Sequence, residues 1–383
     1  MIPLITDKEV ANALEIAVSQ VRRNLPFFND KCQNHSGVNN FYPVCENTQW
    51  TCGFWPGEIW LSYEHTGGNE FRTAGTYWVA SFLNRIKRKI EVDHHDMGFL
   101  YTPSCVAAYK LTGDPSAKKA ALMAANQLLG RFQPVGEFIQ AWGELGAKEN
   151  YRYIIDCLLN LPLLYWAGRE TRDEKFGDIA FRHMATCLKY SIRDDGSTFH
   201  TVFMNPNTGE FDHGETCQGY SDTSSWTRGQ AWAVYGAALS YRYTRNPEYA
   251  DVFERVLAYY LNHLPDDLIP YWDLIFTGGD VEPKDSSSAS IVVCGLLEMS
   301  RFVSNEQSKT YTDLARQTLF SLWSNYSVKD PQVSNGLVLH GTYSKKSPYN
   351  TCTSEGVDEC VSWGDYFYLE GLTRLSKDWE PYW

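Results

Sequence analysis

The sequence lacks any hydrophobic run that approaches the roughly 20 apolar residues of a membrane-spanning helix. Its opening segment, MIPLITDKEVANALEIAVSQVRRN, lacks the basic start, the apolar stretch and the small-residue cleavage site of a signal peptide. The segment indicates an amphipathic helix instead. We therefore expect a cytoplasmic protein that has no membrane partner.

Basic residues are also scarce. The chain of 383 residues carries 34 Lys and Arg against 46 Asp and Glu, which gives a formal net charge of −12. Proteins that bind nucleic acid through its phosphates usually present a basic face, so this balance disfavours a nucleic-acid partner. Charged residues make up only 21% of the chain and aromatic residues 15%, which excludes an intrinsically disordered chain.

The ten cysteines lack the spacing of a structural metal site, since none lies in a C-x-x-C pair. Several lie in helix-like apolar runs, such as Cys157 in IIDCLLN and Cys294 in IVVCGLL. These positions suit reduced, buried thiols in a cytoplasm better than a disulfide framework. We expect no metal and no cofactor, and we interpret the isolated histidines His65, His183 and His263 as structural.

Aromatic residues are what the sequence has in excess: 13 Trp, 24 Tyr and 19 Phe. Most of them are expected to belong to the hydrophobic core. Tyr and Trp beyond the needs of a core indicate a cleft that stacks flat ligands, and sugar rings are the usual case.

One kind of turn recurs along the chain: a small polar residue, then Gly, Asp, Asn or Arg, then an acid or Pro. Its instances begin at Thr66, Thr112, Thr171, Thr244, Ser304 and Ser376. An acid or a Pro in this place is typical of a helix N-terminus. The segment before most turns is apolar and aromatic with small residues, as in QAWAVYGAALSYRY, and the segment after is amphipathic, as in EYADVFERVLAYYLNHL. This pattern predicts buried inner helices, each followed by an outer helix that covers it.

The last of these turns lies near the end of the sequence, so the outer partner of the sixth inner helix has to be the N-terminal helix. That pairing closes a ring. We therefore predict an all-α fold with few or no strands, a single (α/α)6 barrel or six-hairpin toroid that spans residues 1–383. An open helical solenoid and a two-domain helical bundle are the alternatives.

The loops that lead into the inner helices would meet at one mouth of such a barrel, where sites are usually built. One loop contains Asp93-His94-His95-Asp96 ahead of an apolar helix, and four adjacent ionisable groups are costly to bury without purpose. Helix capping by an Asp beside solvated histidines is one interpretation. Metal binding by His94 and His95 is another, but neighbours at a helix start point about 100° apart, which suits one ion poorly.

Asp156 lies in the apolar string YIIDCLLN, which we expect to begin an inner helix. An acid in such a place needs a partner or a function. Loss of solvent would raise the pKa of its carboxyl group, which suits a general acid near neutral pH. A buried Asp that is hydrogen-bonded to a neighbouring Trp or backbone group is the structural alternative.

The string GYSDTSSWTRGQAW brings Arg228 and Trp232 to the start of another inner helix. Arg pairs bidentately with a carboxylate and Trp stacks on a ring face, so this string indicates a pocket for an acidic sugar. A surface Arg among core Trp residues is the alternative. Further candidates in similar segments are Trp50, Trp55, Trp142, His200, His340 and Trp363.

Seven strings of the sequence resemble those of the unsaturated glucuronyl hydrolases, glycoside hydrolase family 88, and follow the family's order. They are NTQWTCGFWPGEIWLSYE, VDHHDMGFLYTPS, FIQAWGE, YIIDCLLNLPLL, GYSDTSSWTRGQAWAVYG, YWDLIF and SWGDYFYLE. The resemblance implies the (α/α)6 fold. It also implies an enzyme that removes the 4,5-unsaturated glucuronic acid from lyase-generated glycosaminoglycan oligosaccharides of the chondroitin and hyaluronan type. The family does so by hydrating the C4=C5 vinyl ether.

The resemblance further implies roles for single residues. Asp156 matches the family's general acid/base, and Asp96 matches an accessory Asp whose charge would help to hold the proton on Asp156. The positions that match sugar-binding residues are Trp50, His95, Trp142, His200, Gln218, Arg228, Trp232 and His340. Because an acidic protein would have to bind an anionic sugar, we expect Arg228 and the histidines to make the pocket locally positive.

The loop after His340 departs from the family pattern. Some members that act on sulfated disaccharides carry Ser-x-x-Ser-x-Lys there, and Ser344 and Ser347 fit the two serines as substrate-binding residues. Pro348 and Tyr349 follow, so the lysine is lost, and the adjacent Lys345 and Lys346 are the substitutes we expect. A solvated surface loop is the alternative.

Three other functions stay open at this point. An unsaturated rhamnogalacturonyl hydrolase is disfavoured by the DHHDMGF and TRGQAW strings. A sugar epimerase on the same toroid would use histidines as its acid and base and would leave Asp156 unexplained. A sugar-binding barrel has no need of a buried acid. The expected partner is a small anionic oligosaccharide, and the sequence does not determine the oligomeric state, a monomer being one option.

Overall fold

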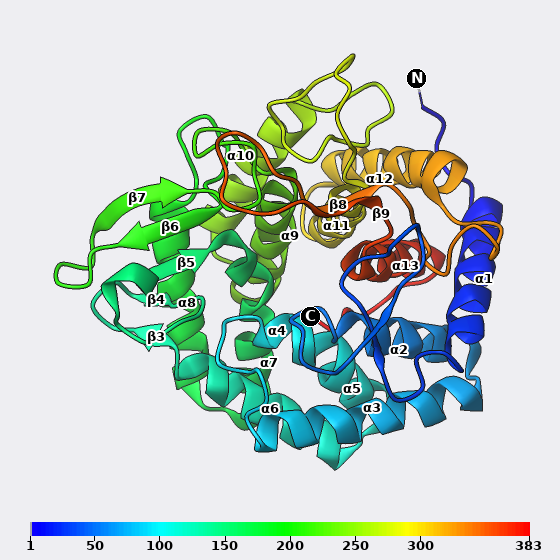
Figure 1. The fold of residues 1–383 in the computed structure, drawn as a ribbon, viewed down its shortest axis with the longest axis horizontal. Helices are drawn as coiled ribbons and strands as arrows, with labels where there is room; N and C mark the ends of the chain where they lie inside the picture. The colour runs from blue at the N-terminus through cyan, green and yellow to red at the C-terminus, as the bar shows by residue number, and fades with distance from the viewer. Residues whose placement is uncertain (1) are drawn as a thin grey trace.

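The helices form a closed ring of two layers (Figure 1), as seen in a computed structural model that describes residues 2–383. The inner layer consists of α2 (Phe54–Thr66), α4 (Met97–Tyr101) with η1 (Thr102–Val106) and α5 (Ala107–Thr112), η3 (Ile155–Leu159) with α7 (Leu161–Thr171), α9 (Thr227–Thr244), α11 (Ser286–Met299) and α13 (Ser362–Ser376). The outer layer consists of α1 (Asp7–Asn24), α3 (Asn69–Lys87), α6 (Pro115–Leu129), α8 (Glu174–Tyr190), α10 (Pro247–Asn262) and α12 (Asn305–Ser321) with η4 (Leu322–Tyr326).

Burial separates the two layers as the hydrophobic patterns predict. Every residue of α11 is buried, because this inner helix is covered on all sides. The outer helix α10 buries a single stripe, whose members recur every three or four residues: Tyr249, Val252, Phe253, Val256, Leu257 and Tyr260. The charged side chains between these positions, Asp251, Glu254 and Arg255, are exposed.

The recurrent turn has one structural cause, seen clearly at residues 112–114. The Thr112 hydroxyl donates to the carbonyl of Ala108 and accepts the backbone N–H of Asp114, whose carboxylate in turn caps α6 by accepting the N–H of Ser116. Gly113 between them is left-handed, with a φ of 71°. The same Thr hydrogen bonds recur at Thr66, Thr171 and Thr244.

The ring closes where the sequence predicts. Helix α1 packs against α13, the sixth inner helix, and takes the place of its missing outer partner. The chain ahead of α1 is tied to α12 through Arg316, whose guanidinium donates to the carbonyl of Ile5 over 2.7 Å and whose carbonyl accepts the Ile5 N–H over 3.2 Å. The predicted (α/α)6 barrel is therefore confirmed.

Strands are few and short. β1 (Cys32–Gln33) pairs with β2 (Val44–Cys45), β3 (Phe132–Gln133) with β4 (Phe138–Ile139), and β8 (Gly341–Ser344) with β9 (Glu355–Glu359), all antiparallel. β5 (Arg152–Ile154), β6 (Thr201–Met204) and β7 (Phe211–Glu215) form a three-stranded sheet with β6 in the middle. Side chains from β5 to β9 line the cavity described below, so the strands build the mouth of the barrel.

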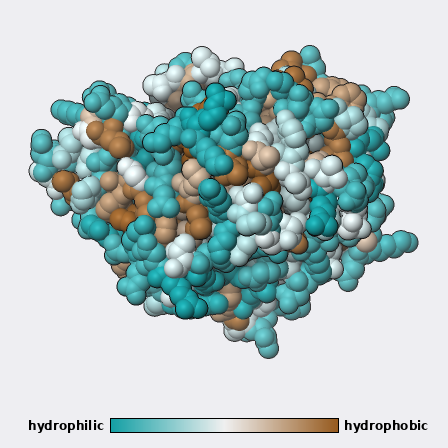
Figure 2. Space-filling view, turned by 90° about the horizontal axis from the view of Figure 1, so that it is seen from below, coloured by the Kyte–Doolittle hydropathy of each residue, from teal (hydrophilic) through white to brown (hydrophobic). Residues whose placement is uncertain are grey.

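The surface shows no continuous apolar band on the face in Figure 2, where hydrophobic residues are interspersed among hydrophilic ones. None of the helices described between residues 2 and 383 combines the length and apolarity that are needed to cross a membrane.

Candidate active site

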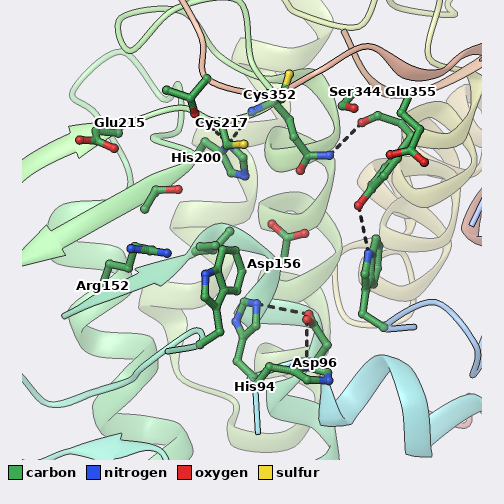
Figure 3. A pocket seen from close by; sticks show the side chains of 18 of the residues that line it. His94, Asp96, Arg152, Asp156, His200, Glu215, Cys217, Ser344, Cys352 and Glu355 are labelled. Atoms are coloured by element: carbon green, nitrogen blue, oxygen red, sulfur yellow. Dashed lines mark hydrogen bonds and ion pairs between the residues drawn. The ribbon is translucent and has the colours of Figure 1, made fainter. Parts of the chain in front are cut away.

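A cavity of about 790 Å³ opens among the loops that lead into the inner helices (Figure 3). Its volume is in the range of sites that enclose small ligands. Segments from across the sequence meet in its wall: Trp50, His94, His95, Asp96, Trp142, Arg152, Asp156, His200, Gln218, Tyr343, Ser344, Cys352 and Glu355 are among the lining residues. Eight of these thirteen come from loops, in keeping with a scaffold that carries its chemistry at one mouth.

Asp156 lies at the start of η3 and projects into this cavity. Its Oδ1 atom is buried and has no hydrogen-bond partner among residues 2–383. Burial, with the nearby charge of Asp96 as a second cause, raises the pKa of Asp156 to about 7, although Arg228 and Trp232 oppose the rise. A carboxyl group with this pKa can both donate and accept a proton near neutral pH.

Asp96 occupies the N-cap position of α4 and stays ionised where Asp156 does not. Its carboxylate oxygens lie 3.2 Å from Nδ1 of His94 and 3.3 Å from Nε2 of His95. Burial by itself would raise the pKa of Asp96, but His95, His94 and the amide of Asn160 outweigh it and lower the pKa below its usual value. Two neighbouring carboxyl groups with pKa values pushed apart can divide acid and base roles between them.

The buried histidines of the cavity are neutral near pH 7. Burial lowers the pKa of His95 to about 4 and that of His200 to about 3. Nδ1 of His200 accepts the backbone N–H of Cys217 over 3.2 Å, which leaves the ring proton on Nε2. These rings can donate hydrogen bonds to a sugar, but our expectation that they make the pocket positive is wrong for both.

Arg228 is completely buried behind the cavity wall and does not line the cavity. Its guanidinium lies 3.3 Å from the Asp285 carboxylate and donates to the backbone carbonyls of Thr342 and Tyr343 over 2.6 and 2.7 Å. Its charge is therefore paired and it holds β8 in place. Trp232 is equally buried, and its indole N–H has no hydrogen-bond partner within 3.5 Å among the described residues.

The aromatic and amide candidates lie where a sugar could meet them. Trp50 and Trp142 line the cavity, and the exposed fraction of Trp142 is 42%. Gln218 lines the cavity too, with its side-chain amide donating to the carbonyl of Tyr343 over 2.9 Å. Ser344 also lies in the wall, at the end of β8.

Two further sequence candidates, in addition to Arg228 and Trp232, lie outside the cavity lining. His340 is outside the cavity lining, because its left-handed backbone (φ 64°) directs the ring to Asp358, whose carboxylate lies 2.7 Å from Nδ1. Ser347 is buried and structural: its hydroxyl donates to the carbonyl of Tyr220 and accepts the N–H groups of Tyr349 and Asn350. We therefore correct the placement of both residues in the pocket.

Several lining residues were not among our candidates, notably Arg152, Glu215, Tyr343 and Glu355. Arg152 had a detectable signal, since it stands two residues before Ile154 and four before Asp156, the alternation of a strand that directs every second side chain to one face. The other three lie on the short antiparallel strands β7, β8 and β9, which the helical pattern of the sequence did not predict.

One cluster has the residue types of a metal site. Cys157, His183 and Cys187 are buried together, with the two Sγ atoms 3.6 Å apart and Nε2 of His183 3.7 Å from Cys187 Sγ. Nδ1 of His183 accepts the backbone N–H of Ile139 over 3.0 Å, so the ring proton is on Nε2. An imidazole that binds a metal through one ring nitrogen normally donates a hydrogen bond from the other. Because Nδ1 of His183 accepts a hydrogen bond, Nε2 carries the proton and cannot bind a metal, so these three residues do not fit a metal site.

An (α/α)6 barrel with a proton-donating carboxyl group beside an ionised one, in a cavity edged by tryptophans, defines an acid/base enzyme of the carbohydrate-active kind. Residues 28–361 match the model of Glycosyl Hydrolase Family 88. The chain belongs to glycoside hydrolase family 88.

Individual relatives are similar along almost the whole chain. An unsaturated chondroitin disaccharide hydrolase of Streptococcus pyogenes serotype M1 is 45% identical over 381 residues, which cover 99% of this chain and 94% of the relative. The crystal structure of unsaturated glucuronyl hydrolase from Streptococcus agalactiae has a TM-score of 0.95 and 46% identity, and the match covers 100% of this chain and 95% of the other. A variant of that enzyme crystallised with dGlcA-GalNAc6S has a TM-score of 0.87 and 41% identity, with the same coverage.

Proposed function

We propose that this enzyme removes the 4,5-unsaturated glucuronic acid from the non-reducing end of lyase-generated glycosaminoglycan oligosaccharides, with Asp156 as the general acid and base. The observation that carries the proposal is the carboxyl group of Asp156, which projects into the cavity with a pKa of about 7 beside the ionised Asp96. The names of the S. pyogenes and S. agalactiae relatives, and the disaccharide bound to the latter, support the choice of substrate.

The proposed chemistry uses one carboxyl group twice. Protonated Asp156 gives its proton to C4 of the vinyl ether, and positive charge develops at C5 next to the ring oxygen. The Asp156 carboxylate then takes a proton from the water that adds at C5. The resulting hemiketal opens and releases the second sugar. Ionised Asp96 keeps the Asp156 pKa high enough for the first step and stabilises the cationic centre of the second.

The remaining lining residues have binding roles in this proposal. Trp50 and Trp142 would stack on the sugar rings, and the neutral His95 and His200 would donate to sugar oxygens. Gln218 would do the same with the part of its amide that Tyr343 leaves free. Arg228 and Trp232 act from behind the wall, the first by holding β8 and the second by its proximity to Asp156.

The test is direct. The protein is incubated with unsaturated chondroitin or hyaluronan disaccharide, and the ultraviolet absorbance of the conjugated alkene is followed. Hydration removes the double bond, so absorbance is expected to fall as free second sugar appears in equal amount. If no unsaturated disaccharide is consumed, the proposed function is wrong.

The pH dependence of kcat/KM follows from the pKa of Asp156. Because that pKa is raised to about 7, the acid form is present below this pH and is lost as the pH rises through it. We expect kcat/KM to fall on the alkaline side, towards about tenfold per pH unit. Asp96→Asn removes the charge that helps to raise this pKa, so any residual activity of the variant should decline at lower pH than in the wild type. A profile that stays flat from pH 6 to 9 would contradict the assignment.

We also infer that residues 1–383 form one catalytic domain, since the N-terminal helix completes the ring that the C-terminal inner helix needs. A cytoplasmic location is supported by the ten cysteines, all of which are free thiols, with Cys157 and Cys187 unbonded although their sulfurs are 3.6 Å apart.

A further inference from the structure

The cavity wall is unexpectedly acidic for a site that takes an anionic sugar. The lining side chains include five carboxyl groups, those of Glu91, Asp96, Asp156, Glu215 and Glu355. Arg152 is the one Lys or Arg side chain that lines the cavity within residues 2–383. An anionic group of the substrate that lies away from the reacting carbon atoms can therefore contact one cationic side chain of the cavity wall, that of Arg152.

The other basic residues considered for this role are already engaged. Arg228 is paired with Asp285 and buried. In the loop after His340, Lys345 forms an ion pair with Glu282, and Lys346 donates to the backbone carbonyl of Asn350. Neither lysine lines the cavity, so the loop offers no direct replacement there for the lysine that its sequence has lost.

Arg152, by contrast, is held in place yet left with free donors. Its guanidinium lies 5.1 Å from the centre of the Trp142 ring and 5.2 Å from that of Phe203, its partner across the β5–β6 pair. Nη1 donates to the carbonyl of Glu149 over 2.8 Å, and no other hydrogen bond of this side chain to residues 2–383 is present. No carboxylate of the described residues lies within 4.0 Å of it, Glu215 included. A planar guanidinium that is fixed in this way suits bidentate binding of an oxyanion.

Arg152 also lies away from the reacting centre. Figure 3 shows its side chain at one edge of the cavity and Asp156 near the middle. The basic residue whose charge acts on Asp156 is Arg228. The carboxylate of an unsaturated uronate is attached to C5, next to the carbon that Asp156 protonates, so it has to lie beside Asp156. An oxyanion at Arg152 would belong to the other sugar.

We propose that Arg152 binds a sulfate group on the second sugar of the substrate and so determines the preference of this enzyme for sulfated disaccharides. The inference rests on the proposed function. It moves sulfate binding from the serine-containing loop, where Ser347 is turned to Tyr220, to the edge of the sheet formed by β5 and β6.

The test compares Arg152→Met with the wild type on three unsaturated chondroitin disaccharides: unsulfated, 4-sulfated and 6-sulfated. A charge-assisted bidentate contact is expected to change KM by about 10-fold or more. We therefore expect KM to rise by that factor for at least one sulfated disaccharide, with less than about a threefold change for the unsulfated one. Arg152→Lys keeps the positive charge but lacks the planar guanidinium that binds an oxyanion through two hydrogen bonds. Its KM for the sulfated disaccharide should therefore lie between those of the wild type and Arg152→Met.

Lys346→Met is the matched control, because it removes one positive charge from the loop after His340, outside the cavity lining, and should leave the ratio of KM values unchanged. The inference is overturned if Arg152→Met raises KM equally for all three disaccharides. That result is expected if the Arg152 side chain only supports the ring of Trp142. It is also overturned if nothing changes, or if the wild type consumes the unsulfated disaccharide alone. In each of these cases turnover by the wild type still upholds the proposed function, whereas a wild type that consumes no disaccharide overturns both.

Discussion

Asp156→Asn is expected to lower kcat by about 10²-fold or more, the scale of general acid–base catalysis, while ligand binding is retained. Asn has nearly the same shape as Asp but cannot give a proton to C4 or take one from water. The backbone carbonyl of Asp156 still accepts from the Asn160 amide over 3.1 Å, so η3 should keep its position. The measurement is kcat by ultraviolet absorbance, together with calorimetric binding of the disaccharide.

The matched control is Asp365→Asn. Burial raises the pKa of Asp365 to about 7 as well, but its carboxylate accepts from the Tyr42 hydroxyl and the Val338 N–H and does not line the cavity. This variant should lose stability and keep a kcat within about threefold of the wild type. Near-normal turnover by Asp156→Asn would make Asp156 a structural acid.

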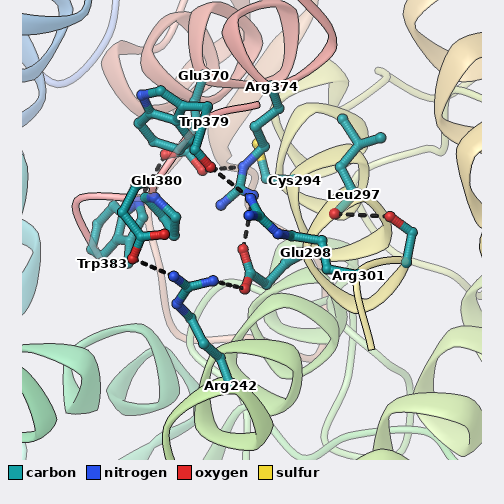
Figure 4. Close-up of polar contacts among 12 residues, drawn as sticks. Arg242, Cys294, Leu297, Glu298, Arg301, Glu370, Arg374, Trp379, Glu380 and Trp383 are labelled. Carbon is teal, nitrogen blue, oxygen red and sulfur yellow. Dashed lines mark hydrogen bonds and ion pairs between the residues drawn. The ribbon is translucent and has the colours of Figure 1, made fainter. Parts of the chain in front are cut away.

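Arg374→Met is expected to be the most destabilising of the substitutions considered, with a loss of about 3–5 kcal/mol in the free energy of unfolding. Arg374 on α13 lies 2.8 Å from Glu298 of α11 and 3.0 Å from Glu370 (Figure 4), and both carboxylates are completely buried. Arg242 of α9 is the second cation of this network, 2.9 Å from Glu298. Removal of Arg374 leaves two buried carboxylates with one cation, and desolvated charge without a partner is costly.

The comparison is made by urea unfolding, with Arg22→Met as the control. Arg22 pairs with Glu70 over 3.0 Å at the surface, where both side chains are nearly half exposed, so its loss should cost at most about 1 kcal/mol. Equal midpoints for the two variants would show that the buried network contributes little to stability. Both variants should retain kcat if they fold, because neither residue lies near the cavity.

The fold was predictable because its signals are local. A Thr, a left-handed residue and a capping Asp or Asn make a complete helix–helix connection within three positions, and this unit repeats along the chain. The difference between helices buried all round and helices with one apolar stripe then assigns each to a layer. The closure of the ring by α1 follows because the sixth inner helix has no outer helix after it in the sequence. The sheet of β5, β6 and β7 was not predictable, since β5 and β6 are separated by the whole α7–α8 hairpin.

The site was predictable only as far as it depends on sequence neighbours. Asp156 and Asp96 stand out because they are acids next to apolar helices, and both line the cavity. Arg228 matches a sugar-binding position, yet its contacts with Asp285 and β8 depend on the tertiary structure. His340 and Ser347 were misplaced for a similar reason: one left-handed residue and one buried hydroxyl decide where this loop points.

The raised pKa of Asp156 makes the folding of this enzyme dependent on proton uptake. An unfolded Asp releases its proton at about pH 4, whereas the folded protein keeps it until about pH 7. The folded state is therefore favoured by this group below pH 4, and the advantage is lost as the pH rises to 7, at up to about 1.4 kcal/mol per unit. Asp156→Asn escapes this loss, so the inactive variant should be more stable than the wild type at pH 8. The proton that starts the reaction thus also stabilises the barrel, because the folded protein binds it more tightly than the unfolded chain does.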